Sequence, residues 1–306
     1  MKLISYQKFN KIKLGLLLQS LVIDLGLVYK FLSKKNRVKF RTGFPSDMIS
    51  LIKQGLEKTR LVEKIIKDDL QYFLIKLPQA FSRLEEVKLL APIPRTKKNI
   101  ICLGLNYLDH AKETNTHPPQ KPIFFTKSPT SVIGPNADII LPKSSKEIDY
   151  EVELAFIIGK KGKNISKNKA LDHVVGYTVF NDITARDLQR NHLQWFKGKS
   201  LDTFAPMGPY LVTKDEISNP HDLKLSLKLN GKIMQISNTS KMYFRIPTLL
   251  ESLSQDMTVE PGDIVATGTP AGVGFMRKPA VFLKHGDIVE AYVEKIGVIK
   301  NRVRQL

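Results

Sequence analysis

Two glutamates that lie two residues apart are the first feature of this sequence that suggests chemistry. Glu151 and Glu153 belong to "IDYEVELAFIIGK", residues 148–160, where apolar and polar residues alternate as they do in a β-strand. Residues i and i+2 of a strand point the same way, with Cα atoms roughly 6.5 Å apart. Two carboxylates about 4 Å apart repel by about 4 kcal/mol at an effective dielectric constant of ~20. Such a pair faces water, takes up a proton or holds a cation, and the spacing alone leaves these alternatives open.

A third carboxylate, that of Asp182, extends this pattern. It follows a predicted strand in "GYTVFNDITARD", and a helix over residues 184–196 is expected to begin next, with Thr184 as its cap. A side chain at a strand-to-helix junction is firmly held and still accessible, although Asp182 could itself be the cap. Three carboxylates without a cluster of Cys or His suit a hard divalent cation such as Mg²⁺ or Mn²⁺.

Two further segments carry residues suited to acid–base chemistry or charge stabilisation. In "HAKE", His110 and Glu113 are three residues apart, so a helix would place them on one face. A carboxylate that orients an imidazole makes a general base for water, although this spacing is also common by chance. Lys199, in "FKGKSLDTFAPMGP", could stabilise a developing enolate or balance the carboxylates, or could simply be solvated.

A glycine-rich stretch and one cysteine complete the set of candidates. "GDIVATGTPAGVG" contains Thr267 and Thr269, whose hydroxyls could bind a carboxylate where glycines let the backbone approach a ligand, or could belong to a structural turn. Cys102 lies in an apolar run and is interpreted as core. The hydrolase elbow, the zinc-protease motif and the dinucleotide fingerprint are absent, and "GKS" at 198–200 lacks the upstream glycine of a phosphate loop, since Leu193 stands there.

Composition indicates a soluble protein of a reducing compartment. The 306 residues are 42% hydrophobic and 25% charged, and a single cysteine excludes an internal disulfide. Residues 14–32 are apolar, but Asp24 interrupts them and no cleavage site follows, so two strands, 12–18 and 21–25, are predicted instead of a signal or membrane segment. We therefore expect a cytoplasmic protein.

The net charge of +19 raises the alternative of a nucleic-acid or membrane-surface binder. The lysines are scattered, and no stripe of arginines and aromatic residues runs between them. A solvated basic surface that also attracts small anionic substrates is the favoured interpretation, without a nucleic-acid or membrane partner.

The elements that must position these residues are mostly strands. Residues 1–90 are predicted to form a small N-terminal domain of hairpins with a helix over 46–55 capped by Ser46, and the proline-rich stretch 91–97 is predicted to be a linker. Residues 98–306 contain short apolar runs, a hairpin turn at Asn230-Gly231 and a further helix over 246–255. The predicted class is α+β, mainly β.

In order along the chain, these segments resemble the fumarylacetoacetate hydrolase family. The matching stretches are "NIICLGLNYLDHAKE", "PIFFTKSPTSVIGP", "IDYEVELAFIIGK", "GYTVFNDITARDLQ", "GKSLDTFAPMGP", "LNGKIMQ" and "GDIVATGTPAGVG". The match is dense over 98–306, while 1–90 is similar to the small N-terminal α/β domain of bacterial members. The resemblance implies a catalytic domain with a rolled mixed β-sheet, and it implies a homodimer.

The resemblance also implies roles for individual residues, because none of the matching positions is substituted. It implies Mg²⁺ or Mn²⁺ held by Glu151, Glu153 and Asp182, with Lys199 close to the bound substrate. Contacts to the substrate oxygens are implied for Arg186, Gln189 and Thr269. A water-activating dyad, on a segment that closes over the ligand, is implied for His110 and Glu113.

The expected function is metal-dependent cleavage of a C–C bond in a 2-oxo acid through an enolate, as in fumarylacetoacetate or acylpyruvate hydrolases. Oxaloacetate decarboxylases and the isomerases or hydratases of aromatic catabolism use the same charge stabilisation, so both remain alternatives. Loops near 114–121 and 190–197 are expected to shape the distal part of the pocket. Outside enzymes, the alternatives are a basic nucleic-acid binder and a non-catalytic 2-oxo-acid-binding protein.

Overall fold

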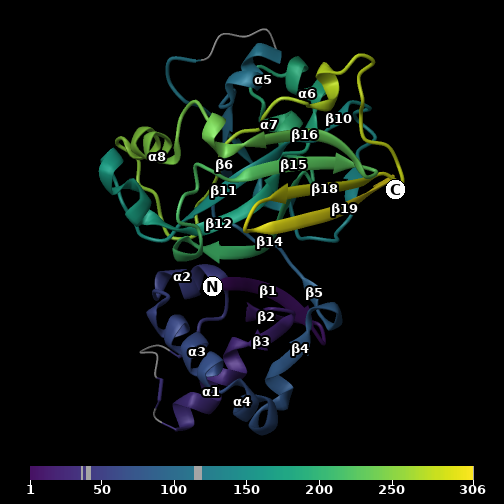
Figure 1. The fold of residues 1–306 in the computed structure, drawn as a ribbon. Helices are drawn as coiled ribbons and strands as arrows, with labels where there is room; N and C mark the ends of the chain where they lie inside the picture. The colour runs from purple at the N-terminus through teal and green to yellow at the C-terminus, as the bar shows by residue number, and fades with distance from the viewer. Residues whose placement is uncertain (36, 39–42, 114–118, 306) are drawn as a thin grey trace.

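The computed structural model describes residues 1–306 except 36, 39–42, 114–118 and 306. Residues 1–90 form a small module, in the lower part of Figure 1. Its strands are β1 (Lys2–Lys8), β2 (Lys11–Leu18), β3 (Leu21–Asp24), β4 (Phe81–Arg83) and β5 (Lys88–Leu89). Its helices are α1 (Leu25–Lys34), α2 (Met48–Lys53), α3 (Glu57–Asp68) and α4 (Leu70–Lys76). The helices bury apolar residues against one face of these strands.

The apolar stretch near the N-terminus is a hairpin followed by a helix. The predicted strands 12–18 and 21–25 are confirmed as β2 and β3. The chain then turns into α1, which was not predicted, because the Asp24 carboxylate caps it by accepting the Leu27 N–H at 2.9 Å. Lys13 balances this carboxylate at 2.7 Å. In the described part of the chain, no helix combines the length and apolar character needed to cross a bilayer.

The helix predicted over 46–55 is present as α2, but the predicted cap is wrong. Asp47, and not Ser46, is the cap, since its carboxylate accepts the Ser50 N–H at 2.8 Å. A carboxylate also interacts more favourably than a hydroxyl with the positive end of the helix. Helices α3 and α4 were not predicted from the sequence.

The larger part of the molecule begins at β6. Its strands are β6 (Ile100–Gly104), β7 (Ile123–Lys127), β8 (Val132–Ile133), β9 (Ile139–Leu141), β10 (Ile148–Asp149), β11 (Val152–Ile158), β12 (Val174–Asn181), β13 (Thr184–Ala185), β14 (Ala205–Thr213), β15 (Lys224–Leu229), β16 (Lys232–Asn238), β17 (Ile264–Ala266), β18 (Ile288–Val293) and β19 (Gly297–Gln305). Its helices are α5 (Leu108–Glu113), α6 (Arg186–Asn191), α7 (Phe196–Lys199) and α8 (Ile246–Ser254). Strands dominate, which confirms the α+β, mainly β class.

One long mixed sheet runs through both parts in the order β4-β3-β2-β1-β14-β12-β11-β17-β6-β7. The junction is an antiparallel pairing of β1 with β14, in which Lys2 is opposite Val212 and Leu3 is opposite Leu211. A second sheet, β16-β15-β18-β19-β9, belongs to the larger part alone. Residues 91–97 contain no helix or strand. The division into domains 1–90 and 98–306 stays a prediction.

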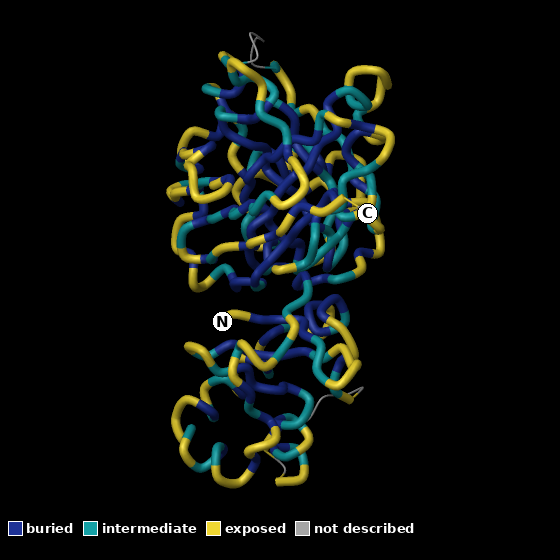
Figure 2. The backbone as a smooth tube through the Cα atoms, turned by 90° about the vertical axis from the view of Figure 1, so that its right-hand side faces the viewer, coloured by how far each residue is buried: buried dark blue, intermediate teal, exposed yellow. Residues whose placement is uncertain are grey.

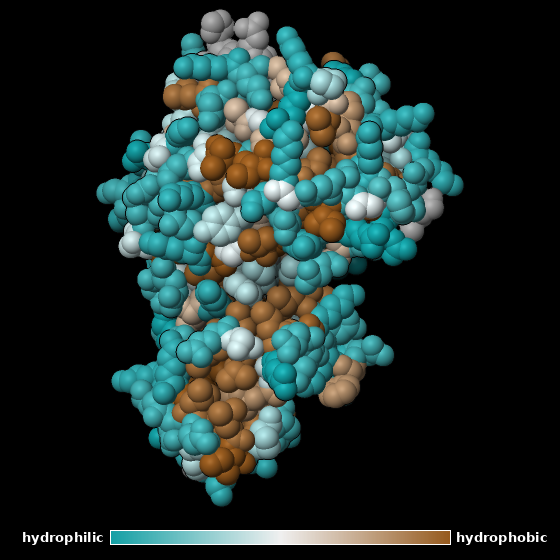
Figure 3. Space-filling model, turned by 45° about the vertical axis from the view of Figure 1, so that its right-hand side comes forward, coloured by the Kyte–Doolittle hydropathy of each residue, from teal (hydrophilic) through white to brown (hydrophobic). Residues whose placement is uncertain are grey.

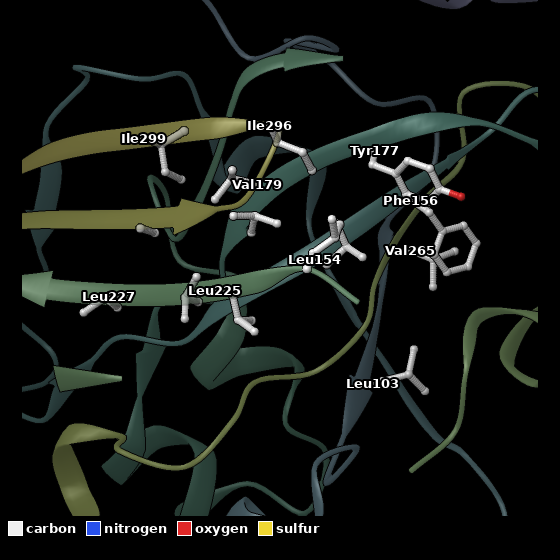
Figure 4. Packing of buried hydrophobic residues seen from close by; sticks show 14 of the residues in the cluster. Leu103, Leu154, Phe156, Tyr177, Val179, Leu225, Leu227, Val265, Ile296 and Ile299 are labelled. Atoms are coloured by element: carbon white, nitrogen blue, oxygen red, sulfur yellow. The ribbon is translucent and has the colours of Figure 1, made fainter. Parts of the chain in front are cut away.

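Strand β11 is buried along its whole length, as the dark tube in Figure 2 illustrates for the centre of the larger part. On one side, Leu154 and Phe156 belong to the cluster that includes Leu225 of the second sheet, as Figure 4 shows. On the other side, Ala155 and Ile157 belong to the cluster that includes the small module. A strand covered on both faces has no solvent side. Glu153 lies in this strand and Glu151 directly precedes it, and both are buried, so the interpretation in which these glutamates face water is wrong.

The single helix predicted over 184–196 is broken in the structure. Thr184 lies in β13, which pairs with β10, and its hydroxyl donates to the Asp182 carbonyl at 2.9 Å, so it caps no helix. Helices α6 and α7 follow separately. The helix predicted over 246–255 is confirmed as α8, and the hairpin at Asn230-Gly231 joins β15 to β16 with φ values of 52° and 80°.

The elements that bear the candidate residues gather at one end of the molecule. Helices α5, α6 and α7 and strand β10 lie at the end farthest from the N-terminal module (Figure 1). Most of the surface in the view of Figure 3 is hydrophilic, with apolar patches on both parts.

Candidate active site

The three predicted carboxylates meet at one buried point. One oxygen from each of Glu151, Glu153 and Asp182 lies within 4.8 Å of the others. The pairing of β11 with β12 brings them together, because Asp182 follows β12 and its N–H donates to the Glu151 carbonyl at 2.8 Å. The residues are 5%, 0% and 0% exposed, so water does not screen their repulsion.

Buried cations neutralise two of these three carboxylates. Lys199 Nζ lies 2.9 Å from Glu151 Oε2 and 2.7 Å from Asp182 Oδ2. Arg186 bridges Glu151 and Asp149, and Lys127 donates to the second oxygen of Asp182. Burial alone would raise the pKa of the Glu151 carboxyl, but Lys199 and then Arg186 lower it to about 2.

Among the described residues, none forms an ion pair with Glu153. The Gly268 N–H donates to Oε2 at 2.8 Å, while Oε1 has no hydrogen-bond partner within the described residues. Burial, and then the Asp182 and Glu151 carboxylates, raise the pKa of Glu153 well above its usual range. An unpartnered buried oxygen beside two further carboxylates fits a divalent cation, which takes hard oxygen ligands. The residues present therefore fit a metal ion.

Two residues of this charge cluster, Lys127 and Asp149, were not predicted as site residues from the sequence. Lys127 is fully buried at the end of β7, where it also donates to the Ile183 carbonyl at 2.9 Å, and burial lowers its pKa. Asp149 is also fully buried, and it accepts the N–H of Gly274 at 2.7 Å and the Arg186 side chain. The available signals were a lone lysine ending the apolar run "PIFFTK" and an acidic residue two positions before Glu151.

The predicted dyad is held in place by the glycine-rich loop. His110 Nδ1 lies 3.3 Å from Glu113 Oε2, and both residues belong to α5. The Gly272 N–H donates to both Glu113 oxygens, at 2.9 and 3.1 Å. Gly272 has φ of 103°, and an added Cβ would lie 2.3 Å from the Met234 carbonyl oxygen. Only glycine fits this position without strain, so the loop fixes the carboxylate that orients His110.

A cavity of about 450 Å³ connects the dyad with the carboxylate cluster. Its lining includes six of the predicted site residues, namely His110, Glu151, Arg186, Gln189, Lys199 and Thr269. Gln189 accepts from Arg186 Nη1 at 3.1 Å, and the Thr269 hydroxyl donates to the Val152 carbonyl at 2.9 Å. Of the loops expected to shape the pocket, residues 190, 192, 193 and 195 line it, whereas residues 114–118 lie outside the described part.

Two of the weaker sequence candidates lie away from this cavity. Thr267 is fully buried and its hydroxyl donates to the Leu154 carbonyl at 2.8 Å, so it supports the strand instead of a ligand. Cys102 is fully buried in β6, and burial raises the pKa of its thiol well above the usual range, which fits the predicted core position.

The geometry agrees with what known proteins show. Residues 99–304 match the model of the family described as "Fumarylacetoacetate (FAA) hydrolase C-terminal". The chain belongs to the fumarylacetoacetate hydrolase family. The resemblance inferred from the motifs is thereby confirmed, and so is the fold class.

Members of this family give more specific comparisons. The chain is 46% identical over 266 residues to "Oxaloacetate tautomerase FAHD2A, mitochondrial" of Bos taurus, covering 86% of this chain and 82% of the relative. It is 43% identical to "Oxaloacetate tautomerase YisK" of Bacillus subtilis (strain 168), covering 99% and 100%. The structure of maleylpyruvate hydrolase from Sphingobium sp. SYK-6 in complex with manganese(II) and pyruvate superimposes with a TM-score of 0.76 at 27% identity, covering 100% and 99%.

Proposed function

We propose that this family member is a divalent-metal-dependent tautomerase that interconverts the enol and keto forms of oxaloacetate or a close 2-oxo acid. One observation carries the proposal: Glu151, Glu153 and Asp182 form one buried cluster, and Glu151 lines a cavity together with its partners Lys199 and Arg186. Two relatives with that activity in their names support the substrate, and the manganese and pyruvate in the solved structure of a third support a divalent metal ion and a 2-oxo acid.

Different residues of the cavity are proposed to bind different groups of the substrate. A bound Mg²⁺ or Mn²⁺ would supply positive charge for the carboxylate and the 2-oxygen of the substrate. Arg186 and Gln189 line the cavity with N–H groups that can donate to the substrate carboxylate, whereas the Thr269 hydroxyl already donates to the Val152 carbonyl. The Asp182 and Glu151 carboxylates outweigh the effect of burial and raise the pKa of Lys199, which therefore stays an ammonium. This ammonium stabilises the negative charge that the 2-oxygen carries in the enolate.

Tautomerisation also requires one proton to leave the enol oxygen and one to arrive at C3. His110 lines the cavity and Glu113 orients its ring, so the imidazole is placed to exchange a proton with the substrate. In the direction from enol to keto, the electron pair of the enolate forms the new C3–H bond. The reverse direction removes the same proton.

Cleavage of a C–C bond is the second candidate. The dyad favours it, since an imidazole oriented by a carboxylate can activate water to attack the distal carbonyl of an acylpyruvate. Hydrolysis and decarboxylation generate the same enolate at C3, so the same cations stabilise it. This candidate is the function expected first from the sequence, and it stays a proposal.

The decisive experiment follows the ultraviolet absorbance of enol-oxaloacetate after its solid enol form is dissolved. The protein is assayed with Mg²⁺, with Mn²⁺ and with a chelator, beside the Glu151→Gln and Lys199→Met variants. Glu85→Gln is a matched control, because Glu85 is exposed, pairs with Arg83 and does not line the cavity. We expect metal-dependent acceleration that both site variants lose and the control retains. A rate no faster than the spontaneous one with either metal would overturn the proposal.

Assembly and location remain part of the proposal. We expect a homodimer, which light scattering of the purified protein tests directly. The cytoplasm is the expected compartment. One relative is bacterial and the other is named as mitochondrial, so imaging of a tagged full-length chain is the test.

A further inference from the structure

The distal part of the cavity has an aromatic wall. Trp195, the one tryptophan of the chain, meets Phe125 edge to face, with ring centroids 5.3 Å apart, and both line the cavity. Gly104 of β6 makes room for the indole, because an added Cβ would lie 2.6 Å from its ring. Residues from β6, from β7 and from the turn before α7 therefore build one aromatic wall, in which the two rings stand at 67° to each other.

This wall is connected to the charged end of the cavity. Lys199 Nζ lies 5.1 Å from the centroid of the Phe125 ring, on the side toward the carboxylate cluster. The Lys199 N–H donates to the Trp195 carbonyl at 3.1 Å. This hydrogen bond of the short helix α7 links the tryptophan just before the helix to the lysine at its end. A ligand whose carboxylate reaches Lys199 and Arg186 places its distal atoms along the two rings.

The cavity is larger than a four-carbon diacid needs. Oxaloacetate has nine non-hydrogen atoms, which would fill only about 270 Å³ even at the roughly 30 Å³ that each water occupies in the liquid. The cavity holds about 450 Å³, and its remaining lining away from the charged end includes Leu103, Leu105 and Leu193. The rim arginine, Arg190, already pairs with Glu147 at 2.7 Å. Among the described residues of this distal lining, the arginine is thus already paired, and the leucines and aromatic rings outnumber the one further ionisable side chain, His192.

We propose that Trp195 is a specificity-determining residue, and that the site accepts 2-oxo acids whose distal group is flat and apolar, such as arylpyruvates. This inference rests on the proposed function for its reaction, but it concerns recognition. Edge-to-face and stacked contacts with the two rings favour a planar substituent over an aliphatic carboxylate, whose desolvation in this part of the cavity would be uncompensated.

Binding can be measured without turnover, because 2-hydroxy acids do not tautomerise. The probes are 3-phenyllactate and malate, which share the 2-hydroxy acid end and differ in the distal group. They are titrated into the manganese-loaded protein, with the fluorescence of Trp195 as the direct readout and calorimetry as the second. We expect phenyllactate to change the emission and to bind at least tenfold more tightly than malate. Equal affinities, or tighter binding of malate, would overturn the inference.

Variants of the wall separate recognition from folding. We expect Trp195→Leu to reduce the affinity ratio of phenyllactate to malate at least tenfold by calorimetry, and Trp195→Phe to restore most of it. Gly104→Ala should push the indole into the cavity and lower the same ratio. Arg190→Met tests the rim: a selective loss of malate binding would show that a second carboxylate is recognised there, against the inference.

Activity assays keep the two proposals distinguishable. If the protein accelerates the tautomerisation of oxaloacetate but not of phenylpyruvate, the proposed function stands and the aromatic specificity fails. If phenyllactate binding depends on Trp195 and neither 2-oxo acid is turned over, the specificity stands and the tautomerase proposal fails.

Discussion

The Nζ atom of Lys199 lies 2.7 Å from Oδ2 of Asp182, and neither side chain is more than 2% exposed. An ion pair this far from water is costly to desolvate and gains most from good geometry. The second oxygen of Asp182 is taken by Lys127. The aspartate is therefore oriented from two sides, while Glu153 next to it keeps one oxygen without a partner among the described residues.

Metal binding should stabilise the protein through Glu153. We expect Mg²⁺ or Mn²⁺ at about 100 times its dissociation constant to increase the free energy of unfolding by about 2.7 kcal/mol, because the ion binds only the folded state. Thermal unfolding with and without a chelator measures the shift. Glu153→Gln should lose the shift, whereas Glu85→Gln, at an exposed position, should retain it. A full shift in Glu153→Gln would exclude this residue as a ligand.

Lys127 should be important for folding as well as for the site. Lys127→Met leaves an Asp182 oxygen buried without its cation, and we expect a loss of about 3–5 kcal/mol in the free energy of unfolding. Lys30→Met is the control, because this lysine is exposed on α1 and should change stability by no more than about 0.5 kcal/mol. Urea denaturation measures both. Similar small losses in the two variants would contradict the structural role of Lys127.

The dyad should matter most where water or a proton must be activated. We expect His110→Ala to reduce the hydrolysis of an acylpyruvate about 10²–10⁴-fold, the usual contribution of a general base, and to affect oxaloacetate decarboxylation far less. Glu113→Gln should show a smaller loss of the same pattern. The two reactions are compared as kcat/KM with one metal-loaded preparation. Equal losses in both reactions would argue against the assigned role.

Gly272 should couple the glycine-rich loop to the dyad. Gly272→Ala places a methyl group 2.3 Å from the Met234 carbonyl oxygen and should displace the N–H that holds Glu113. We expect a loss of activity in dyad-dependent reactions together with reduced stability. Gly286→Ala is the matched control, since Gly286 has a similar φ of 92° but its Cβ would meet no atom within 4 Å. The control should cost only about 1 kcal/mol of stability and no activity; an equal loss of activity in both variants would contradict the coupling.

His221 should make stability depend on pH. Burial and then Arg245 lower the pKa of His221 from 6.5 to about 4, and its Nε2 accepts the Ile246 N–H at 3.2 Å. The unfolded state binds the proton first as the pH falls, so stability is lost between about pH 6.5 and pH 4. After allowance for partial exposure we expect about 1–2 kcal/mol.

The pH effect is measured as thermal unfolding across this range. His221→Gln should flatten the profile, whereas His192→Gln, at an exposed position, should leave it unchanged. A profile in His221→Gln as steep as that of the unchanged protein would refute the assignment.

Short-range pattern was enough for several elements. Asn230 and Gly231 adopt the positive φ angles of a hairpin turn because these residue types favour them intrinsically. The alternation of apolar and polar residues predicted strands β2, β3 and β11. The helix predicted over 184–196 was wrong at its start for a long-range reason. Its first two residues, Thr184 and Ala185, form strand β13 and pair with the distant strand β10. The predicted cap was one residue too early, because the Asp47 carboxylate accepts the Ser50 N–H and the helix begins at Met48.

The sequence by itself determined the family, the mainly β class and the residue types able to bind a metal ion, since these depend on identity and spacing along the chain. Only the tertiary structure decided that both faces of β11 are covered, that Lys127 and Asp149 complete the charge cluster, and that Trp195 packs edge to face against Phe125. The physical reason is that burial and ion pairing join segments far apart in the chain, and the spacing within any one segment carries no record of its distant partners.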